Sequence, residues 1–475
     1  MLRIHDRGRG ALALLLLACL SLAAACRGSA EAEPAKPLNV ILIVADDLGV
    51  GDVGCYGQTK IRTPVLDALA RQGLRFTQAY AGAPVCAPSR CSLLTGLHTG
   101  HSAIRDNKAL QPEGQEPLPA GIPTLPELLH EHGYATALIG KWGLGPPGSE
   151  GDPLRRGFER FFGYNCQRRA QNAYPEWLYR GEERVALGGN DPRRGLAATY
   201  APDLMREEAL SFLRQNTERP FFLFFASTVP HVALQVPEDS LAEYAGAFPE
   251  TPYDGRQGYL PHPTPRAAYA AMVSRLDRDV GALLAELERL DLARNTLVVF
   301  TSDNGPTWAG GVDAKFFDST AGLRGLKGQL YEGGIRAPLI VRWPGHVRAG
   351  GESAALCANW DLMPTIAEAC GLRTAEGIDG RSLVPLLEGG PAPARDHLYW
   401  ENPDSGGWQA VRMGDWKAVR RNLKKGIPLA VELYDLAQDP GETRDVARTN
   451  PEIVKRALQI FGSRTPSKIA EWNYP

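Results

Sequence analysis

The amino-acid sequence predicts an α/β protein with a large mixed, mostly parallel sheet flanked by helices, followed by a smaller antiparallel sheet and a helix. Continuous apolar runs rich in β-branched and aromatic residues recur through most of the 475-residue chain, with amphipathic segments between them. Runs without polar alternation are typical of strands buried on both faces. The last part of the chain instead carries short strand-like pieces separated by turn residues, which predicts antiparallel pairing.

The larger region should contain five buried strands, at residues 39–44, 135–139, 221–226, 296–301 and 338–343. One helix is expected over 63–73, where a proline favours its start and Gly73 its end. A longer helix is expected over 266–290, because apolar side chains recur there at helical spacing. We assign this α/β region to residues 38–389.

Residues 390–475 form the second region, which we expect to be a small α+β subdomain packed on the first. Its predicted strands cover residues 397–401, 409–412, 416–420 and 431–436. A final helix is expected over residues 451–461.

The amino terminus has the pattern of an export signal over residues 1–25. Three arginines precede the apolar run 11–25, which is too short to span a bilayer comfortably. Small residues at 23–25 then offer a cleavage site. Residues 26–37 would follow as a flexible tether.

Cys26 leaves two routes of export open. An apolar run, small residues and then a cysteine resemble a bacterial lipoprotein signal, with Cys26 as the acylated residue, although Leu22 lies four rather than three residues before it. Plain cleavage near Ala25 or Ala30 is the alternative. Either route predicts an exported protein, periplasmic or lipid-anchored at the cell envelope, with no other membrane association.

Composition excludes several classes of partner and fold. The chain is 44% apolar and 22% charged, as in ordinary soluble proteins, and its formal charge of −2 gives no basis for nucleic-acid binding. The eight cysteines, two of them in or beside the leader, are too few for a disulfide-rich framework. Cys357 and Cys370 could pair, and no Cys/His cluster has zinc spacing.

The segment Cys86-Ala87-Pro88-Ser89-Arg90 predicts an anion site at a helix start. Pro88 suits the first turn of a helix, and Gly96 suits its end. Cys86 would then lie at the helix amino terminus, where free N–H groups favour an anion, and Arg90 would face the same anion about one turn later. A buried structural cysteine is the alternative.

Polar residues follow three of the predicted strands. Asp46 and Asp47 follow the first, Asp303 and Asn304 follow the fourth, and His231 comes shortly after the third. Open α/β sheets bind ligands at the carboxyl ends of their strands. Three aspartates gathered there would repel one another without a cation, and all-oxygen ligands suit Ca²⁺ or Mg²⁺.

These motifs together resemble the type I, formylglycine-dependent sulfatases, and most closely their arylsulfatase A and N-acetylgalactosamine-6-sulfatase branch. The resemblance covers nearly the whole chain from Asn39 onward and includes residues 331–338, Tyr-Glu-Gly-Gly-Ile-Arg-Ala-Pro. It implies an alkaline-phosphatase-like fold and a sulfuric ester hydrolase. It also implies that an enzyme of the host converts Cys86 to Cα-formylglycine.

The resemblance assigns roles to individual residues. It implies one divalent metal, with Ca²⁺ expected ahead of Mg²⁺, on ligands Asp46, Asp47, Asp303, Asn304 and the modified Cys86. It implies that the sulfate is held and polarised by Arg90, Lys141, His231 and Lys327, with His231 as the candidate general acid. The hydrated aldehyde offers two hydroxyls on one carbon, one to attack sulfur and one whose deprotonation expels sulfate.

Gly143 departs from the family pattern. Family members usually have Gly-Lys-Trp-His, whose histidine contacts the formylglycine diol, whereas this chain has Gly-Lys-Trp-Gly. The residues that could fill the gap are Gln167, Arg168, Arg169, Gln171 and Asn172 in a following loop, or His98 and His101 after the cysteine helix.

The expected substrate is a sulfate ester, on a carbohydrate or another small molecule. Aromatic residues that could stack on sugar rings are Tyr174, Trp177, Trp308 and Trp408, unless they pack in the core. Two alternatives stay open at this point. One is a phosphate or phosphonate monoester hydrolase of the same fold. The other is a sulfated-glycan-binding protein with weak turnover.

Overall fold

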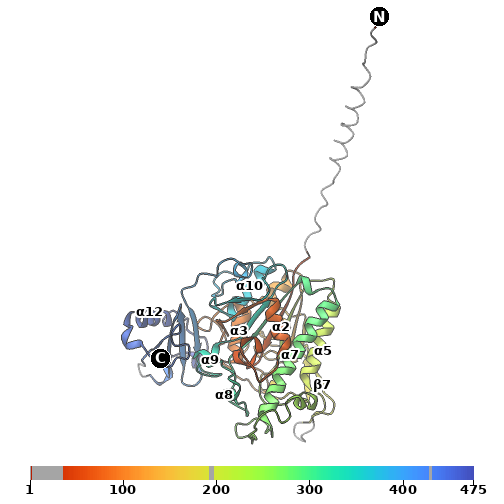
Figure 1. Ribbon diagram of the computed structural model, residues 1–475, viewed down its shortest axis with the longest axis horizontal. Helices are drawn as coiled ribbons and strands as arrows, with labels where there is room; N and C mark the ends of the chain where they lie inside the picture. The colour runs from red at the N-terminus through yellow and green to blue at the C-terminus, as the bar shows by residue number, and fades with distance from the viewer. Residues whose placement is uncertain (1, 3–35, 192–196, 427–429, 475) are drawn as a thin grey trace. The chain divides into compact units, whose positions relative to one another are not determined.

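A ten-stranded mixed sheet forms the centre of the protein in the computed structural model, which describes residues 2, 36–191, 197–426 and 430–474 (Figure 1). The strand order is β11-β2-β10-β9-β1-β8-β4-β5-β6-β7. Its five central strands, from β9 to β5, pair in parallel, while β10, β6 and β7 pair antiparallel with their neighbours. The strand bounds are β1 Asn39–Ala45, β2 Leu74–Phe76, β4 Ala135–Lys141, β5 Arg160–Tyr164, β6 Trp177–Arg180, β7 Glu183–Ala186, β8 Phe221–Ala226, β9 Thr296–Ser302, β10 Leu339–Arg342 and β11 Gly351–Ser353.

Helices cover both faces of this sheet, as continuous apolar strands require. Alternate residues of β1 point to opposite sides, Ile41 and Ile43 into one core cluster and Leu42 and Val44 into another. The first cluster is closed by α2 Pro64–Gln72, α5 Ala201–Gln215 and α7 Pro265–Arg289. The second is closed by α3 Cys86–Thr95, α4 Leu125–Glu131, α10 Leu362–Ala369 and α11 Val384–Leu387. In Figure 1, α5 and α7 run side by side along one flank.

The carboxyl-terminal region contains the second sheet, whose four strands pair antiparallel in the order β13-β14-β15-β16. Their bounds are β13 Leu398–Asn402, β14 Trp408–Met413, β15 Trp416–Arg421 and β16 Glu432–Asp435. One face carries α12 Pro451–Phe461, and the other contributes Trp400 to a cluster with Tyr80 and Trp360 of the larger region. The remaining short elements are β3 Ala79–Tyr80, β12 Cys357–Ala358, α6 Glu238–Leu241, α8 Ala314–Phe317 and α9 Glu332–Ile335.

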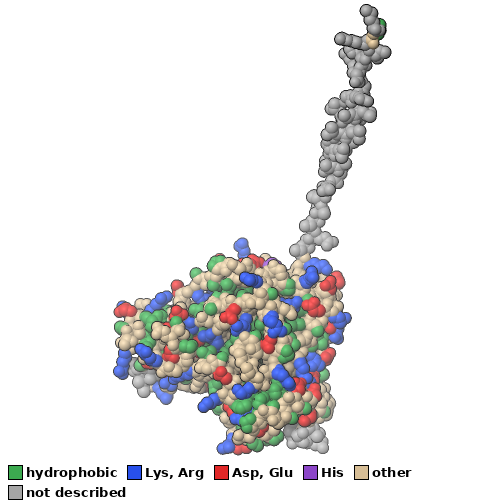
Figure 2. Space-filling model, in the orientation of Figure 1, with side chains coloured by type: hydrophobic (Ala, Val, Ile, Leu, Met, Phe, Trp, Pro, Cys, Tyr) green, Lys and Arg blue, Asp and Glu red, His purple; other side chains and the backbone are tan. Residues whose placement is uncertain are grey.

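The predicted fold class is confirmed, and the predicted buried strands and helices differ from the observed ones by two residues or fewer at each end. The central parallel strand β5 and the short strands β2, β6, β7 and β11 were not predicted. The predicted leader and Cys26 lie outside the described residues. Within the described ranges, no helix has the length and apolar character to cross a bilayer. Figure 2 shows acidic and basic side chains interspersed over the visible face, in keeping with the small net charge.

Candidate active site

Four neighbouring parallel strands bring the predicted site residues to one edge of the sheet. Along β9, β1, β8 and β4, the carboxyl ends supply Asp303, Asp46, His231 and Lys141 respectively. Because these strands run in the same direction, residues distant in sequence meet at this edge. All four residues are buried.

The turns after β1 and β9 hold four oxygen-bearing side chains together. Asp47 has a left-handed backbone (φ 66°), and its N–H donates to Asp303 Oδ1 at 3.2 Å. Asn304 Nδ2 donates to Asp47 Oδ1 at 2.8 Å. With Asp46, these side chains are at most 1% exposed.

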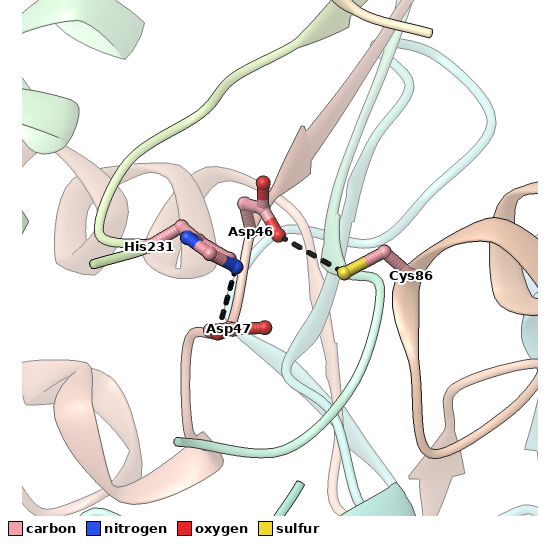
Figure 3. Close-up of side chains that lie close together, drawn as sticks. All are labelled: Asp46, Asp47, Cys86 and His231. Carbon is pink, nitrogen blue, oxygen red and sulfur yellow. Dashed lines mark hydrogen bonds and ion pairs between the residues drawn. The ribbon is translucent and has the colours of Figure 1, made fainter. Parts of the chain in front are cut away.

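Cys86 is the first residue of α3 and points toward Asp46 (Figure 3). Its Sγ lies 3.6 Å from Asp46 Oδ1. Burial raises the pKa of the thiol to about 12, although Lys141 and Lys327 act in the opposite direction. Within the protein alone, burial therefore disfavours the thiolate form of unmodified Cys86. On the same helix, Cys91 contacts Ser102 and packs in the core, as a structural cysteine does.

Three cations neutralise the three carboxylates. Arg90 donates from Nε and Nη2 to Asp303 Oδ2 at 3.1 and 2.9 Å. Lys141 Nζ lies 2.7 Å from Asp46 Oδ2, and Lys327 Nζ lies 2.8 Å from Asp47 Oδ2.

These ion pairs determine how the groups ionise. Burial by itself raises the pKa of Asp46, but Lys141 and the other nearby cations outweigh it and hold the pKa well below the usual range. Burial disfavours the Lys327 ammonium, but Asp47 outweighs it and raises the lysine pKa well above its ordinary value. The site therefore holds fixed opposite charges, ready to exchange partners with an anion or a metal ion.

His231 faces Asp47 from the loop after β8, with its Nε2 3.6 Å from Asp47 Oδ2 (Figure 3). Its Nδ1 contacts the carbonyl oxygen of Val232, which orients the ring. Burial and the nearby Lys327 lower the pKa of His231 to about 4 against the opposing effect of Asp47. An anion bound beside the ring would raise this pKa and favour the protonated form.

The donor set fits a hard divalent cation. Ligand atoms of Asp46, Asp47, Cys86 and His231 lie within 4.8 Å of one another. Asn304 Oδ1 is buried beside Asp47 without a hydrogen-bond partner in the described structure, so it is free to bind a cation. Carboxylate and amide oxygens are the ligands that Ca²⁺ and Mg²⁺ prefer.

Glu332, which the sequence showed only as part of the 331–338 motif, holds the segment that carries Lys327. Its carboxylate is completely buried between Lys417 Nζ at 2.9 Å and the Tyr80 hydroxyl at 2.8 Å. Two residues later, the Gly334 carbonyl accepts the N–H of Gly305 at 3.0 Å, directly after Asn304. In the sequence, the position of this glutamate within a Gly-rich, apolar segment was the signal that could have indicated a buried role. Its partner Lys417 lies 85 residues away, so the sequence did not identify the ion pair.

Several residues considered from the sequence lie elsewhere. His98 Nε2 lies 3.4 Å and His101 Nδ1 lies 2.9 Å from Asp379 Oδ1. The N–H of Gly100 donates to His98 Nδ1. Cys357 and Cys370 are free thiols. The aromatic candidates mostly pack internally: Tyr174 on Tyr200, Trp177 under Arg169 and Trp408 against Tyr331. Trp308 differs, because it is 60% exposed.

Comparison with known proteins gives consistent matches over most of the chain. A family model described as Sulfatase matches residues 38–372, and one described as N-sulphoglucosamine sulphohydrolase, C-terminal, matches residues 326–459. The chain is 34% identical to steryl-sulfatase of Mus musculus over 81% of this chain and 70% of that protein. It is 33% identical to arylsulfatase A of Homo sapiens over 90% of this chain and 87% of that protein.

A solved structure is similar over nearly the same extent. The complex of Ps i-CgsB with k-i-k-neocarrahexaose superposes with a TM-score of 0.77 and 28% identity. The match covers 91% of this chain and 94% of that one.

Proposed function

The chain belongs to the sulfatase family, and from this premise we propose that it hydrolyses sulfate monoesters, with Cys86, once oxidised to formylglycine, as the nucleophile. The observation that carries the proposal is the position of Cys86. It lies at a helix amino terminus, 3.6 Å from Asp46, among three cations and a set of oxygen donors. Its raised thiol pKa argues against catalysis by the unmodified cysteine.

We propose that Asp46, Asp47, Asp303 and Asn304, with the modified residue 86, hold one divalent metal. Ca²⁺ is favoured over Mg²⁺, because Ca²⁺ accepts six to eight oxygen ligands, whereas Mg²⁺ usually keeps several waters and takes one or two carboxylates. The metal would supply positive charge to neutralise the sulfate and lower the pKa of the attacking hydroxyl.

The basic residues would bind the sulfate group and protonate the leaving alcohol. Arg90, Lys141 and Lys327 are placed to bind sulfate oxygens, because each already carries a charge-assisted contact that an anion can replace. Such fixed charges stabilise the negative charge that develops in the transition state. Protonated His231 would give its proton to the leaving alcohol oxygen.

A hollow beside the site favours a sulfated carbohydrate as substrate. Trp308, Tyr253, Arg256 and Arg266 are among the residues around a hollow of about 660 Å³. Gly310, in the same loop as Trp308, lies against the side chain of Val232, next to His231. Arg256 and Arg266 pair with Asp254 and Asp313 of the same hollow, so the exposed indole of Trp308, which can stack on a sugar ring, is the feature that supports a carbohydrate.

We further propose export, with Cys26 acylation or plain cleavage as the two routes, and maturation by a formylglycine-generating enzyme of the host. The apolar leader and its small-residue cleavage site support export. The required oxidation of Cys86 supports the need for that enzyme.

The test compares a sulfate and a phosphate ester of one phenol on protein that carries the aldehyde. We expect the sulfate ester to have the higher kcat/KM. Faster phosphate release would favour the phosphatase alternative. Binding of a sulfated oligosaccharide without turnover of either ester would favour a glycan-binding protein.

A further inference from the structure

Gly143 and Gln167 occupy one space between them. Gly143 has a left-handed backbone (φ 94°), and a Cβ added there would lie 2.5 Å from Gln167 Nε2 and 2.7 Å from its Cγ. Real Cβ atoms do not approach other atoms so closely, so any larger residue at 143 would displace the glutamine side chain. The side chain absent at 143 is therefore replaced in space by the Gln167 carboxamide.

Gln167 is buried with an unused hydrogen-bond donor. The residue is 8% exposed, and its Nε2 has no hydrogen-bond partner in the described structure. Its backbone N–H is fixed by the buried Gln115, whose Oε1 accepts it at 3.0 Å. Leaving a buried donor unpaired destabilises the folded protein. An apolar residue would avoid that cost, so the unpaired amide points to a ligand.

The sheet directs Gln167 toward the same edge as the other site residues. Gln167 follows the carboxyl end of β5, just as Lys141 ends the adjacent parallel strand β4. The pairing continues beyond both strands, because Gly143 N–H donates to the Asn165 carbonyl at 3.2 Å. Five adjacent parallel strands, β9, β1, β8, β4 and β5, thus each lead to a side chain at this edge.

Two further loops contact the loop that carries Gln167. Ala233 N–H donates to the Gln171 carbonyl at 3.0 Å, which joins this loop to the segment after His231. The loop of Gln115 also carries Asn107, whose Oδ1 accepts the N–H of Ala87, next to Cys86. The loop that carries Gln167 is therefore linked by hydrogen bonds to the segment after His231 and, through the loop of Gln115, to the start of the cysteine helix.

We propose that Gln167 Nε2 donates a hydrogen bond to an oxygen of the bound sulfate group, as a further substrate-binding residue that depends on Gly143 for its space. The inference rests on the proposed sulfatase function. A neutral amide cannot take or give a proton near neutral pH, so its contribution is to charge stabilisation and not to acid–base catalysis.

The test compares Gln167→Leu with Gln171→Leu, a glutamine of the same loop, in the full-length, aldehyde-bearing protein. The readouts are kcat/KM for a sulfated phenol, the Kd for inorganic sulfate by calorimetry, and stability to urea. A hydrogen bond to a charged group corresponds to roughly 10- to 150-fold in an equilibrium constant. For Gln167→Leu we expect kcat/KM and sulfate affinity to fall by about that factor, with stability unchanged or higher. Gln171→Leu should match the parent.

Stability separates this proposal from a purely structural role. If Gln167 only supported the loop, its loss would lower stability. If it binds sulfate, removing an unpaired buried donor costs no stability while binding weakens. Parental kcat/KM and sulfate affinity in Gln167→Leu would overturn the inference and leave the proposed function standing. A parent protein that neither hydrolyses the ester nor binds sulfate would overturn both.

Discussion

Lys417 is the residue whose replacement should most clearly reveal how the two sheets are joined. It lies on β15 and is completely buried, with Nζ 2.9 Å from Glu332 and 3.0 Å from Glu442. Lys417→Met keeps most of the volume and removes the charge. Glu332 keeps Arg336 as a partner, whereas Lys417 is the cation found within ion-pair distance of Glu442 among the described residues.

Removing one member of a buried ion pair costs about 3–5 kcal/mol, because the other charge is left uncompensated. Burial already raises the pKa of Glu442 even beside Lys417, and loss of the lysine should raise that pKa further. A carboxyl whose folded pKa lies above its unfolded pKa loses stability as pH rises between the two values. The loss should therefore approach its full size at pH 8 and be smaller at pH 5.

Urea unfolding followed by tryptophan fluorescence at both pH values measures this effect. The exposed Lys455→Met on α12 is the matched control and should change stability by less than about 0.5 kcal/mol. Adding Glu442→Gln to Lys417→Met should recover part of the loss at pH 8, because the amide needs no cation. A loss below about 1 kcal/mol at pH 8, or a larger loss at pH 5, would refute this reasoning.

Three further predictions concern the site and the core. Cys86→Ala should lower sulfate-ester turnover by at least about a thousandfold without changing the unfolding midpoint, and residual turnover near the parental rate would contradict its proposed role. Asn304→Ala should weaken Ca²⁺ affinity roughly 10- to 100-fold in a calorimetric titration of metal-free protein, whereas unchanged affinity would remove Asn304 from the proposed ligand set. Burial raises the pKa of Asp279 to about 7 despite Arg206, so its carboxylate costs stability increasingly as pH rises from about 4 to 7. The stability of Asp279→Asn to urea, relative to the parent, should therefore be highest at pH 8 and decline toward pH 4, and a pH-independent difference would contradict this assignment.

Long strands buried on both faces were predictable because their composition determines them locally, whereas the shorter central strand β5 was missed. All seven residues of β1 are buried, and the six that follow Asn39 form one apolar run in the sequence. By contrast, β2, β6, β7 and β11 are three or four residues long and partly exposed, so their pairing depends on neighbours distant in sequence. The antiparallel direction of β10 relative to β9 likewise depends on how the chain connects the two strands and not on the residues of β10.

The site could be predicted from the sequence where side chains follow buried strands. Asp46, Asp303 and Lys141 meet because β1, β9 and β4 lie in one parallel sheet. What fills the space at Gly143 was undetermined, because several residues of the following loop had suitable chemistry. Only the continued pairing of the β4 and β5 ends brings Gln167 against it.

The central claim is that oxidised Cys86 is the nucleophile of a sulfatase. Its most direct test is mass spectrometry of the tryptic peptide Phe76 to Arg90, from native-host protein that has just been assayed for sulfate release. We predict that residue 86 is present as the aldehyde, trapped by a hydrazine reagent, and that turnover scales with the aldehyde fraction. Sulfate release from protein in which Cys86 is wholly an unmodified thiol would contradict the account.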